Sequence, residues 1–319
     1  MQNGSMHQQK VAKVSVKINI SEIKKEFSSL WKSQAGCRQI QKALEDYAYE
    51  CVNGILDKIL SEVREITIHS YGNYVFQKLM AVLNDVDLAK IFHELKGAIA
   101  DISKKPYGMR SLQAFVAAIK CYPDIIKEFI QELMPNLEEL ILDQNASHVV
   151  QKSLILFDDI YIFPIVEIIY KNCLNFSKDM HGCCVVQKSL DNKEIFEGSL
   201  KHKIAQIIMD NTTNLIIHPY GNYVIQMLIS SRQKHIAEEV IMKIKNSIAE
   251  FSCDKFASHP VELAYEHAPE DLKKQIIDAM CLTSNIKRIL FDQYGNYVIQ
   301  KILKCCSKDE KKHILSVSI

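Results

Sequence analysis

The sequence predicts an all-α fold made of stacked helical repeats. Only 10 glycines and 7 prolines accompany 48% hydrophobic residues in 319 positions, a composition that favours many short helices over strands and turns. A six-residue motif recurs eight times along the chain, and its copies are almost evenly spaced. Such a period is typical of a helical solenoid, in which each unit buries its apolar face against its neighbours.

The repeated motif opens with glycine in six copies and with alanine in two. Successive copies begin 36, 36, 38, 36, 39, 36 and 38 residues apart. This spacing predicts eight structural units. The copies are GCRQIQ at Gly36, GNYVFQ at Gly72, GMRSLQ at Gly108, ASHVVQ at Ala146, GCCVVQ at Gly182, GNYVIQ at Gly221, ASHPVE at Ala257 and GNYVIQ at Gly295.

Apolar residues within a unit have helical spacing. In the second copy Val75, Phe76 and Leu79 fall on one face, which we expect to point into the core. Another helical stretch precedes each motif, for example residues 88–102 or 125–133, and a short polar or glycine-containing turn joins the two. The sequence therefore predicts two helices in each unit.

The two ends of the chain differ from the repeats. Residues 1–19 carry no copy of the motif and are expected to be a poorly ordered lead-in, so that residues 20–319 form the repeat domain. After the eighth motif, Ser307 is expected to cap a final helix with Asp309 and Glu310 in its first turn. This helix would close the array.

Charge and cysteine usage narrow the functional classes. The net charge of +1 gives weak support for a nucleic-acid partner, unless the basic residues share one face. Ten cysteines are spread over the whole chain, which favours a reducing compartment over a disulfide scaffold. The sequence has no run of about 18 apolar residues, so we expect no contact with a membrane.

Two polar motif positions lie four residues apart, on one helix face, with roughly 5–6 Å between their Cβ atoms. This separation matches the edge of one nucleic-acid base. Core packing does not require a glutamine or glutamate at the same place eight times. The candidate base-edge pairs are Cys37/Gln41, Asn73/Gln77, Met109/Gln113, Ser147/Gln151, Cys183/Gln187, Asn222/Gln226, Ser258/Glu262 and Asn296/Gln300.

A third motif position follows the first member of each pair directly and stands beside the pair on the helix. Seven of its eight side chains carry a planar π surface, on which a base can stack. The candidate stacking residues are Arg38, Tyr74, Arg110, His148, Cys184, Tyr223, His259 and Tyr297.

On these motifs the chain resembles the PUF (Pumilio homology) family over about residues 20–319, with GNYVIQ, GCCVVQ and ASHPVE as the most specific matches. The resemblance implies a right-handed crescent of eight PUF repeats with single-stranded RNA on its concave face. The first repeat would read the 3′ base and the eighth the 5′ base. It further implies a cytoplasmic regulator of messenger RNA 3′ untranslated regions that recruits repressor or deadenylase proteins. We expect a monomer without a cofactor.

In that family an Asn/Gln pair reads uracil, a Ser/Glu pair guanine, and a Cys/Gln or Ser/Gln pair adenine. The chemistry of the residues agrees, since the carboxylate of Glu262 can accept both adjacent N–H donors of guanine. From the eighth repeat to the first, the expected site is about UGUAANUA. Met109 departs from the usual small or polar residue, so the base of the third repeat is left open.

Two further features carry open alternatives. Pro260 is tolerated only in a first helical turn, so we expect the helix of the seventh repeat to begin near Ser258; the alternative is a distorted, inactive repeat. A lysine follows the glutamine in five repeats and either approaches RNA phosphates or is a solvated helix charge. These lysines are Lys42, Lys78, Lys152, Lys188 and Lys301.

Other functional classes have less support. We find no phosphate-binding glycine loop, no nucleophile elbow and no paired metal-ligand motif, so we expect neither an enzyme nor a metal site. The nearest ligand cluster is His181, Cys183 and Cys184, of which two occupy motif positions. A peptide-binding helical scaffold would not explain one glutamate among seven glutamines. A low-specificity nucleolar relative would be more basic and have more repeats.

Overall fold

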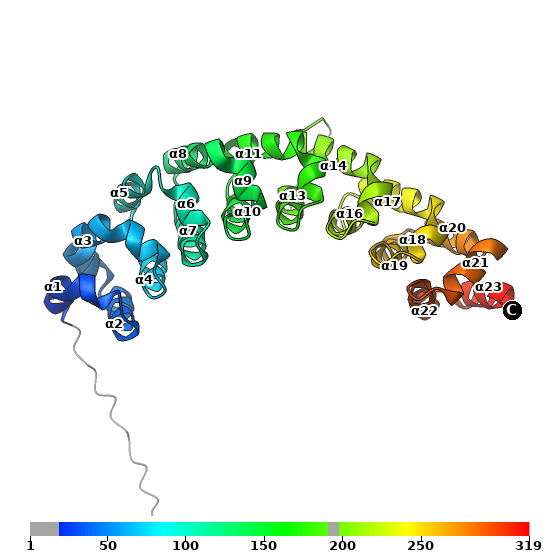
Figure 1. Ribbon diagram of the computed structural model, residues 1–319, viewed down its shortest axis with the longest axis horizontal. Coiled ribbons are helices and arrows are strands. Elements are labelled where there is room, and N and C mark those ends of the chain that lie inside the picture. The colour runs from blue at the N-terminus through cyan, green and yellow to red at the C-terminus, as the bar shows by residue number, and fades with distance from the viewer. Residues whose placement is uncertain (1–18, 191–197, 319) are drawn as a thin grey trace, which may run out of the picture.

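The computed structural model describes residues 19–190 and 198–318, and within these ranges it is helical and contains no strand. The helices stack side by side into a crescent (Figure 1). The predicted all-α repeat solenoid is confirmed. Residues 1–18 of the expected lead-in lie outside the described residues.

One helix of each repeat lies on the concave side of the crescent (Figure 1). Each of these inner helices contacts the next one in chain order, so they form one continuous layer. The inner helices are α2 (Gln34–Asp46), α4 (Gly72–Met80), α7 (Pro106–Ile119), α10 (Ala146–Leu156), α13 (Gly182–Leu190), α16 (Gly221–Ile229), α19 (Ser258–His267) and α22 (Gly295–Cys305).

The remaining helices form the convex layer and the links to the inner layer. The first two repeats begin with α1 (Ile20–Leu30) and α3 (Ala48–Ile68). The outer helices of the later repeats are α5 (Asp85–Leu95), α8 (Pro123–Leu133), α11 (Asp159–Lys171), α14 (Leu200–Asp210), α17 (Lys234–Asn246) and α20 (Glu270–Met280). The linking helices are α6 (Ile99–Ser103), α9 (Leu137–Leu142) with the 3-10 turn η1 (Met134–Asn136) before it, α12 (Cys173–Ser177), α15 (Thr212–Ile216), α18 (Ile248–Ser252) and α21 (Thr283–Phe291).

Within the described ranges the first two repeats have two α-helices each, as expected, whereas each repeat from the third onward has three, so the expectation of two is wrong there. The stretch 88–102 shows why, because it divides into α5 and α6 around Gly97. Gly97 has a φ of 75°, a left-handed conformation that glycine adopts without a steric penalty and that ends a helix. The chain turns there from the outer layer toward the inner layer.

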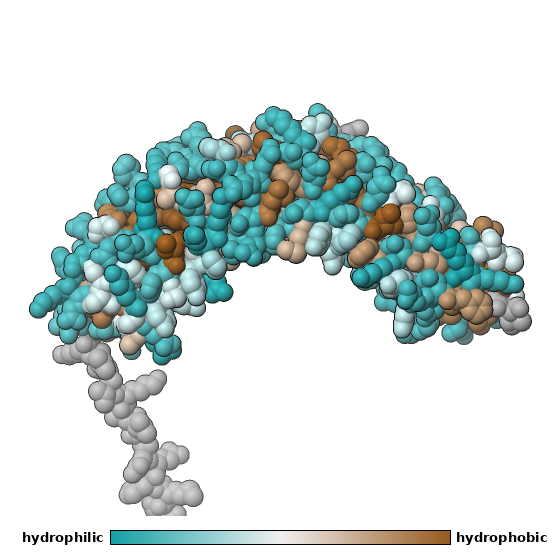
Figure 2. Space-filling model, in the orientation of Figure 1, coloured by the Kyte–Doolittle hydropathy of each residue, from teal (hydrophilic) through white to brown (hydrophobic). Residues whose placement is uncertain are grey.

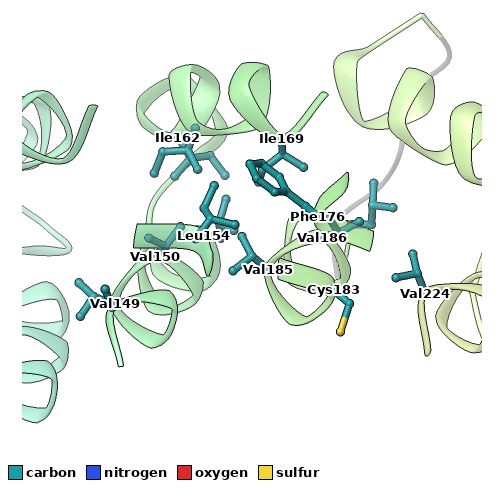
Figure 3. Close-up of a cluster of buried hydrophobic side chains, with 14 of the residues drawn as sticks. Val149, Val150, Leu154, Ile162, Ile169, Phe176, Cys183, Val185, Val186 and Val224 are labelled. Carbon is teal, nitrogen blue, oxygen red and sulfur yellow. The ribbon is translucent and has the colours of Figure 1, made fainter. Parts of the chain in front are cut away.

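The core lies between the layers and runs along the whole crescent. Figure 3 shows Val150 and Leu154 of α10 beside Val185 of α13, with Ile162 and Ile169 of α11 covering them. The predicted inward face of α4 is confirmed, since Phe76 is 0% exposed. Burying one such side chain contributes about 1.5–3 kcal/mol.

Glycine at the start of an inner helix permits a close backbone approach. A Cβ added at Gly72 would lie 2.8 Å from the carbonyl oxygen of Ile66, and one added at Gly221 would lie 2.8 Å from that of Leu215. Real Cβ atoms do not approach backbone oxygens so closely. The glycine thus brings the inner helix against the helix before it.

The C-terminal helix α23 (Lys308–Ser318) closes the array as expected. The backbone N–H of Glu310 donates to Ser307 Oγ at 3.3 Å, and that of Ser307 donates to Glu310 Oε2 at 2.8 Å. These reciprocal bonds form a capping box. Ile314 is 2% exposed and belongs to the common core.

The expectation for Pro260 is also confirmed. Helix α19 begins at Ser258, so the proline occupies the first turn, where it costs no intrahelical hydrogen bond. None of the helices in the described ranges combines the length and the apolarity needed to cross a bilayer.

Candidate functional site

A side chain that accepts hydrogen bonds precedes most inner helices and fixes where each one begins. In the second repeat, His69 Nδ1 accepts from the backbone N–H groups of Tyr71 and Gly72, both at 3.2 Å. As a result, equivalent motif residues take equivalent places in successive repeats. The same acceptor position is occupied by Asp143, Asp179, His218, Asp254 and Asp292.

Sequence reasoning missed these capping residues. The signal was present, because Asp or His stands three residues before the first motif residue in six of the eight repeats. Side chains of this kind satisfy the free N–H groups at a helix start.

The three Asn/Gln pairs share one hydrogen-bond network. In the second repeat, Asn73 Nδ2 donates to the carbonyl oxygens of His69 and Ser70, both at 2.8 Å. Gln77 Nε2 donates to Asn73 Oδ1 at 2.9 Å. Because a carbonyl can only accept, the network also fixes the orientation of both amides. The same network joins Asn222 to Gln226 and Asn296 to Gln300.

This network assigns different roles to the two amides. Asn73 is 0% exposed and has both side-chain N–H groups bound to the backbone. Gln77 is half-buried and keeps its Oε1 and one N–H for a ligand. Asn73 therefore orients Gln77, and Gln77 presents an acceptor and a donor to the concave face.

In the first and third repeats the glutamine bonds to the following repeat instead. Gln41 Nε2 donates to the carbonyl oxygen of Tyr74, and Gln113 Nε2 donates to that of His148, both at 3.2 Å. The first member of the pair is Cys37 in one repeat and Met109 in the other. Neither offers an amide oxygen, and each glutamine donates to a backbone acceptor across the repeat boundary.

The remaining three pairs, in the fourth, fifth and seventh repeats, share no common hydrogen-bond pattern. Gln187 Nε2 donates to the backbone oxygen of Cys183 at 3.1 Å. In the fourth repeat, the buried Ser147 Oγ has no hydrogen-bond partner among the described residues. In the seventh, Glu262 Oε2 lies 3.8 Å from His259 Nδ1, an ion pair only when the histidine is protonated.

The two cysteines among the base-edge candidates are neutral thiols. Burial raises the pKa of Cys37 to about 11. Burial, followed by the neighbouring Cys184, raises the pKa of Cys183 to about 12. A thiolate is the form that binds metal, so these positions suit a small apolar contact better. Across the described part of the chain, no group of three or more His, Cys, Asp or Glu residues could hold a metal ion.

All eight candidate stacking residues are exposed, in contrast to the first members of the pairs, five of which are buried. Tyr74, Tyr223 and Tyr297 are 45%, 51% and 64% exposed. Their ring faces are thus accessible to a base. Figure 2 shows that the concave rim visible in this view is mostly hydrophilic to intermediate.

The inner helices are more basic than the chain as a whole. They carry eight basic side chains and four acidic ones, whereas the whole chain has a net charge of +1. The basic residues are Arg38, Lys42, Lys78, Arg110, Lys152, Lys188, Lys301 and Lys304, and the acidic ones are Glu45, Asp46, Glu262 and Glu266. The excess is concentrated in α4, α7, α10 and α13, which contain no acidic residue.

The family model described as the Pumilio-family RNA binding repeat matches residues 62–96, 136–170, 172–192, 211–226, 247–281 and 286–317, just over half of the chain. The chain belongs to the PUF family. The resemblance on which the eight-repeat fold was expected is therefore confirmed. Repeats of this family are RNA-binding scaffolds and not enzymes.

Curated PUF relatives match most of this chain. Pumilio homolog 12 of Arabidopsis thaliana is 29% identical over 294 residues, which cover 90% of this chain and 48% of the relative. Putative pumilio homolog 8, chloroplastic, of the same plant is 31% identical and is covered over 52% of its length. This chain thus spans about half the length of these relatives.

Solved PUF structures share the crescent. The structure of PUF-8 in complex with PBE-RNA superposes with a TM-score of 0.86 at 23% identity and covers 95% of this chain and 89% of its own. The Puf4 RNA binding domain bound to the HO endonuclease RNA 3′ UTR recognition sequence gives a TM-score of 0.82 at 26% identity, with 91% of each chain covered.

Proposed function

We propose that this protein binds single-stranded RNA with sequence selectivity and reads one base in each repeat. The main support is the eightfold recurrence of one constellation on adjacent inner helices. In every repeat an exposed side chain stands beside a half-buried or exposed glutamine or glutamate, and in seven of the eight, all but that of Cys184, the exposed side chain has a planar surface on which a base can stack. Stacking holds a base by its face, and the amide or carboxylate selects its edge.

The preferred RNA is about UGUAANUA, read from the eighth repeat to the first. For uracil, Gln77, Gln226 and Gln300 each offer an acceptor to N3–H and a donor to a ring carbonyl. For guanine, the Glu262 carboxylate accepts from N1–H and N2–H together. Adenine in the fifth repeat pairs with Gln187, while Cys183 leaves room for the ring.

The cellular role proposed here follows the relatives. Two solved PUF domains carry RNA named as a 3′ UTR recognition sequence. By analogy, this protein is a cytoplasmic, monomeric regulator that binds messenger RNA 3′ untranslated regions and brings repressor or deadenylase proteins to them.

A titration with two RNAs of equal length and composition tests the proposal. One RNA contains UGUAAAUA, and the other contains the same bases in scrambled order. We expect tight binding to the first and at least a hundredfold weaker binding to the second, since several mismatches each cost about 1–3 kcal/mol. Equal affinities would indicate a low-specificity RNA-binding relative. Binding to neither RNA would favour the alternative of a peptide-binding helical scaffold.

A further inference from the structure

The five lysines that follow the base-edge position are not equivalent. Lys78 Nζ lies 2.7 Å from Glu45 Oε1, and Lys301 Nζ lies 2.7 Å from Glu266 Oε1. In both cases the carboxylate belongs to the preceding repeat, four residues after its base-edge residue, Gln41 or Glu262. The ion pair therefore links neighbouring inner helices.

In each ion pair the pKa of one partner is shifted toward its charged form. The hydrogen bond from Lys78, together with its charge, lowers the pKa of the Glu45 carboxyl. The hydrogen bond to Glu266, together with its charge, raises the pKa of Lys301. Each of these ammonium groups thus already has a carboxylate as counter-ion before RNA binds.

Lys152 of α10 has a different environment. The residue corresponding to Glu45 in the preceding repeat is Ala117, and α7 has no acidic side chain at all. Among the described residues, Lys152 has neither an ion-pair nor a hydrogen-bond partner. It stands directly after Gln151 and four residues after the exposed His148, so it shares the face on which a base would stack.

We infer that Lys152 contacts a phosphodiester group of the bound strand in the middle of the array, whereas Lys78 and Lys301 make no such contact. This inference rests on the proposed RNA-binding function. An unpaired ammonium in the basic run of α4 to α13 gains a counter-charge when RNA binds. A lysine already bonded to a carboxylate would first have to leave it.

The salt dependence of RNA affinity provides the test. For single strands, each phosphate contact contributes about 0.7 to the slope of log affinity against log salt concentration. We expect Lys152→Gln to reduce that slope by about 0.7. The matched control is the double variant Lys78→Gln with Glu45→Gln, which removes an ion pair without changing the net charge. Its slope should equal that of the parent.

An RNA with one uncharged methylphosphonate linkage, moved along the site, locates the contact. At one central linkage, parent and Lys152→Gln should bind with equal affinity, because the charge that Lys152 contacts is absent. An unchanged slope in Lys152→Gln, or an equal loss in the control, overturns the inference. If the parent itself does not prefer the UGUA-containing RNA, the proposed function fails instead.

Discussion

Gln77 donates its side-chain N–H to Asn73 Oδ1 at 2.9 Å, and this contact holds a base-reading amide within its own repeat. Gln113, in the next repeat, donates instead to the backbone of the repeat that follows it. The difference lies in the residue one turn earlier, which is asparagine in one case and Met109 in the other. In an Asn/Gln pair the asparagine thus holds the glutamine within its own repeat.

The third repeat offers a direct test of this role. Met109→Asn should give it the pair found in three other repeats and release Gln113 from the carbonyl oxygen of His148. We expect the variant to prefer uracil at the third base from the 3′ end by about 1–3 kcal/mol over the other bases. Affinities for four RNAs that differ only at that base measure this. Unchanged affinities for all four would show that the asparagine does not control the glutamine.

The seventh repeat should be convertible from guanine to uracil. The double variant Ser258→Asn with Glu262→Gln replaces a carboxylate, which accepts two guanine donors, with two amides. Facing uracil, the parent carboxylate would oppose carbonyl oxygens, at a cost of about 1–3 kcal/mol. We expect parent and variant to rank the guanine and uracil RNAs in opposite order. A variant that keeps the guanine preference would exclude Ser258 and Glu262 as the reading pair.

The exposed rings should contribute affinity without selectivity. Replacing Tyr223 by alanine removes a stacking surface that is worth roughly 1–3 kcal/mol and accepts any base. We expect weaker binding of every RNA by a similar factor, with the preferred base of the sixth repeat unchanged. Tyr297→Ala should behave alike in the eighth repeat. Binding as tight as that of the parent would mean that these rings do not touch RNA.

Stability should depend on pH through His218. Its Nδ1 caps α16 by accepting from Tyr220 and Gly221, so only the unprotonated ring can serve. Burial, followed by the charge of Lys178, lowers its pKa below the ordinary 6.5. The capping contribution is therefore fully present above about pH 6.5 and is lost as the pH falls through the lowered folded value.

The variant His218→Asp keeps an acceptor at this place, as the chain itself does at Asp179 and Asp254. Losing an N-cap costs about 0.5–2 kcal/mol. We expect the thermal midpoint of the parent to fall more than that of the variant between pH 7.5 and 5. Parallel curves for the two proteins would contradict a capping role for the neutral ring.

The motif predicted the inner helices well because its glycine, apolar and polar positions each have a separate physical cause. Gly72 permits close packing, Phe76 fills the core, and Gln77 lies at the surface. The division of the outer stretch at Gly97 was missed, since an isolated glycine in a helical pattern does not reveal a positive φ. The roles of the sixteen base-edge residues stay a prediction.

The partners of the glutamines could not be predicted from spacing. Whether Gln41 reaches Tyr74 depends on the distance between neighbouring inner helices, which no single repeat encodes. Similarly, the separation of roughly 5–6 Å between paired positions is the same in all repeats. Only the folded array shows that Asn73 is buried beneath Gln77.

Inner helices that contact chiefly their neighbours make the protein modular in length. Unfolding of the last repeat, α20 to α22 with α23, leaves the inner helices of the other seven repeats in contact with one another as before. On the proposed function, such a molecule still binds RNA selectively, but it reads seven bases instead of eight. Fraying then appears as relaxed discrimination at the 5′ base before it appears as loss of binding.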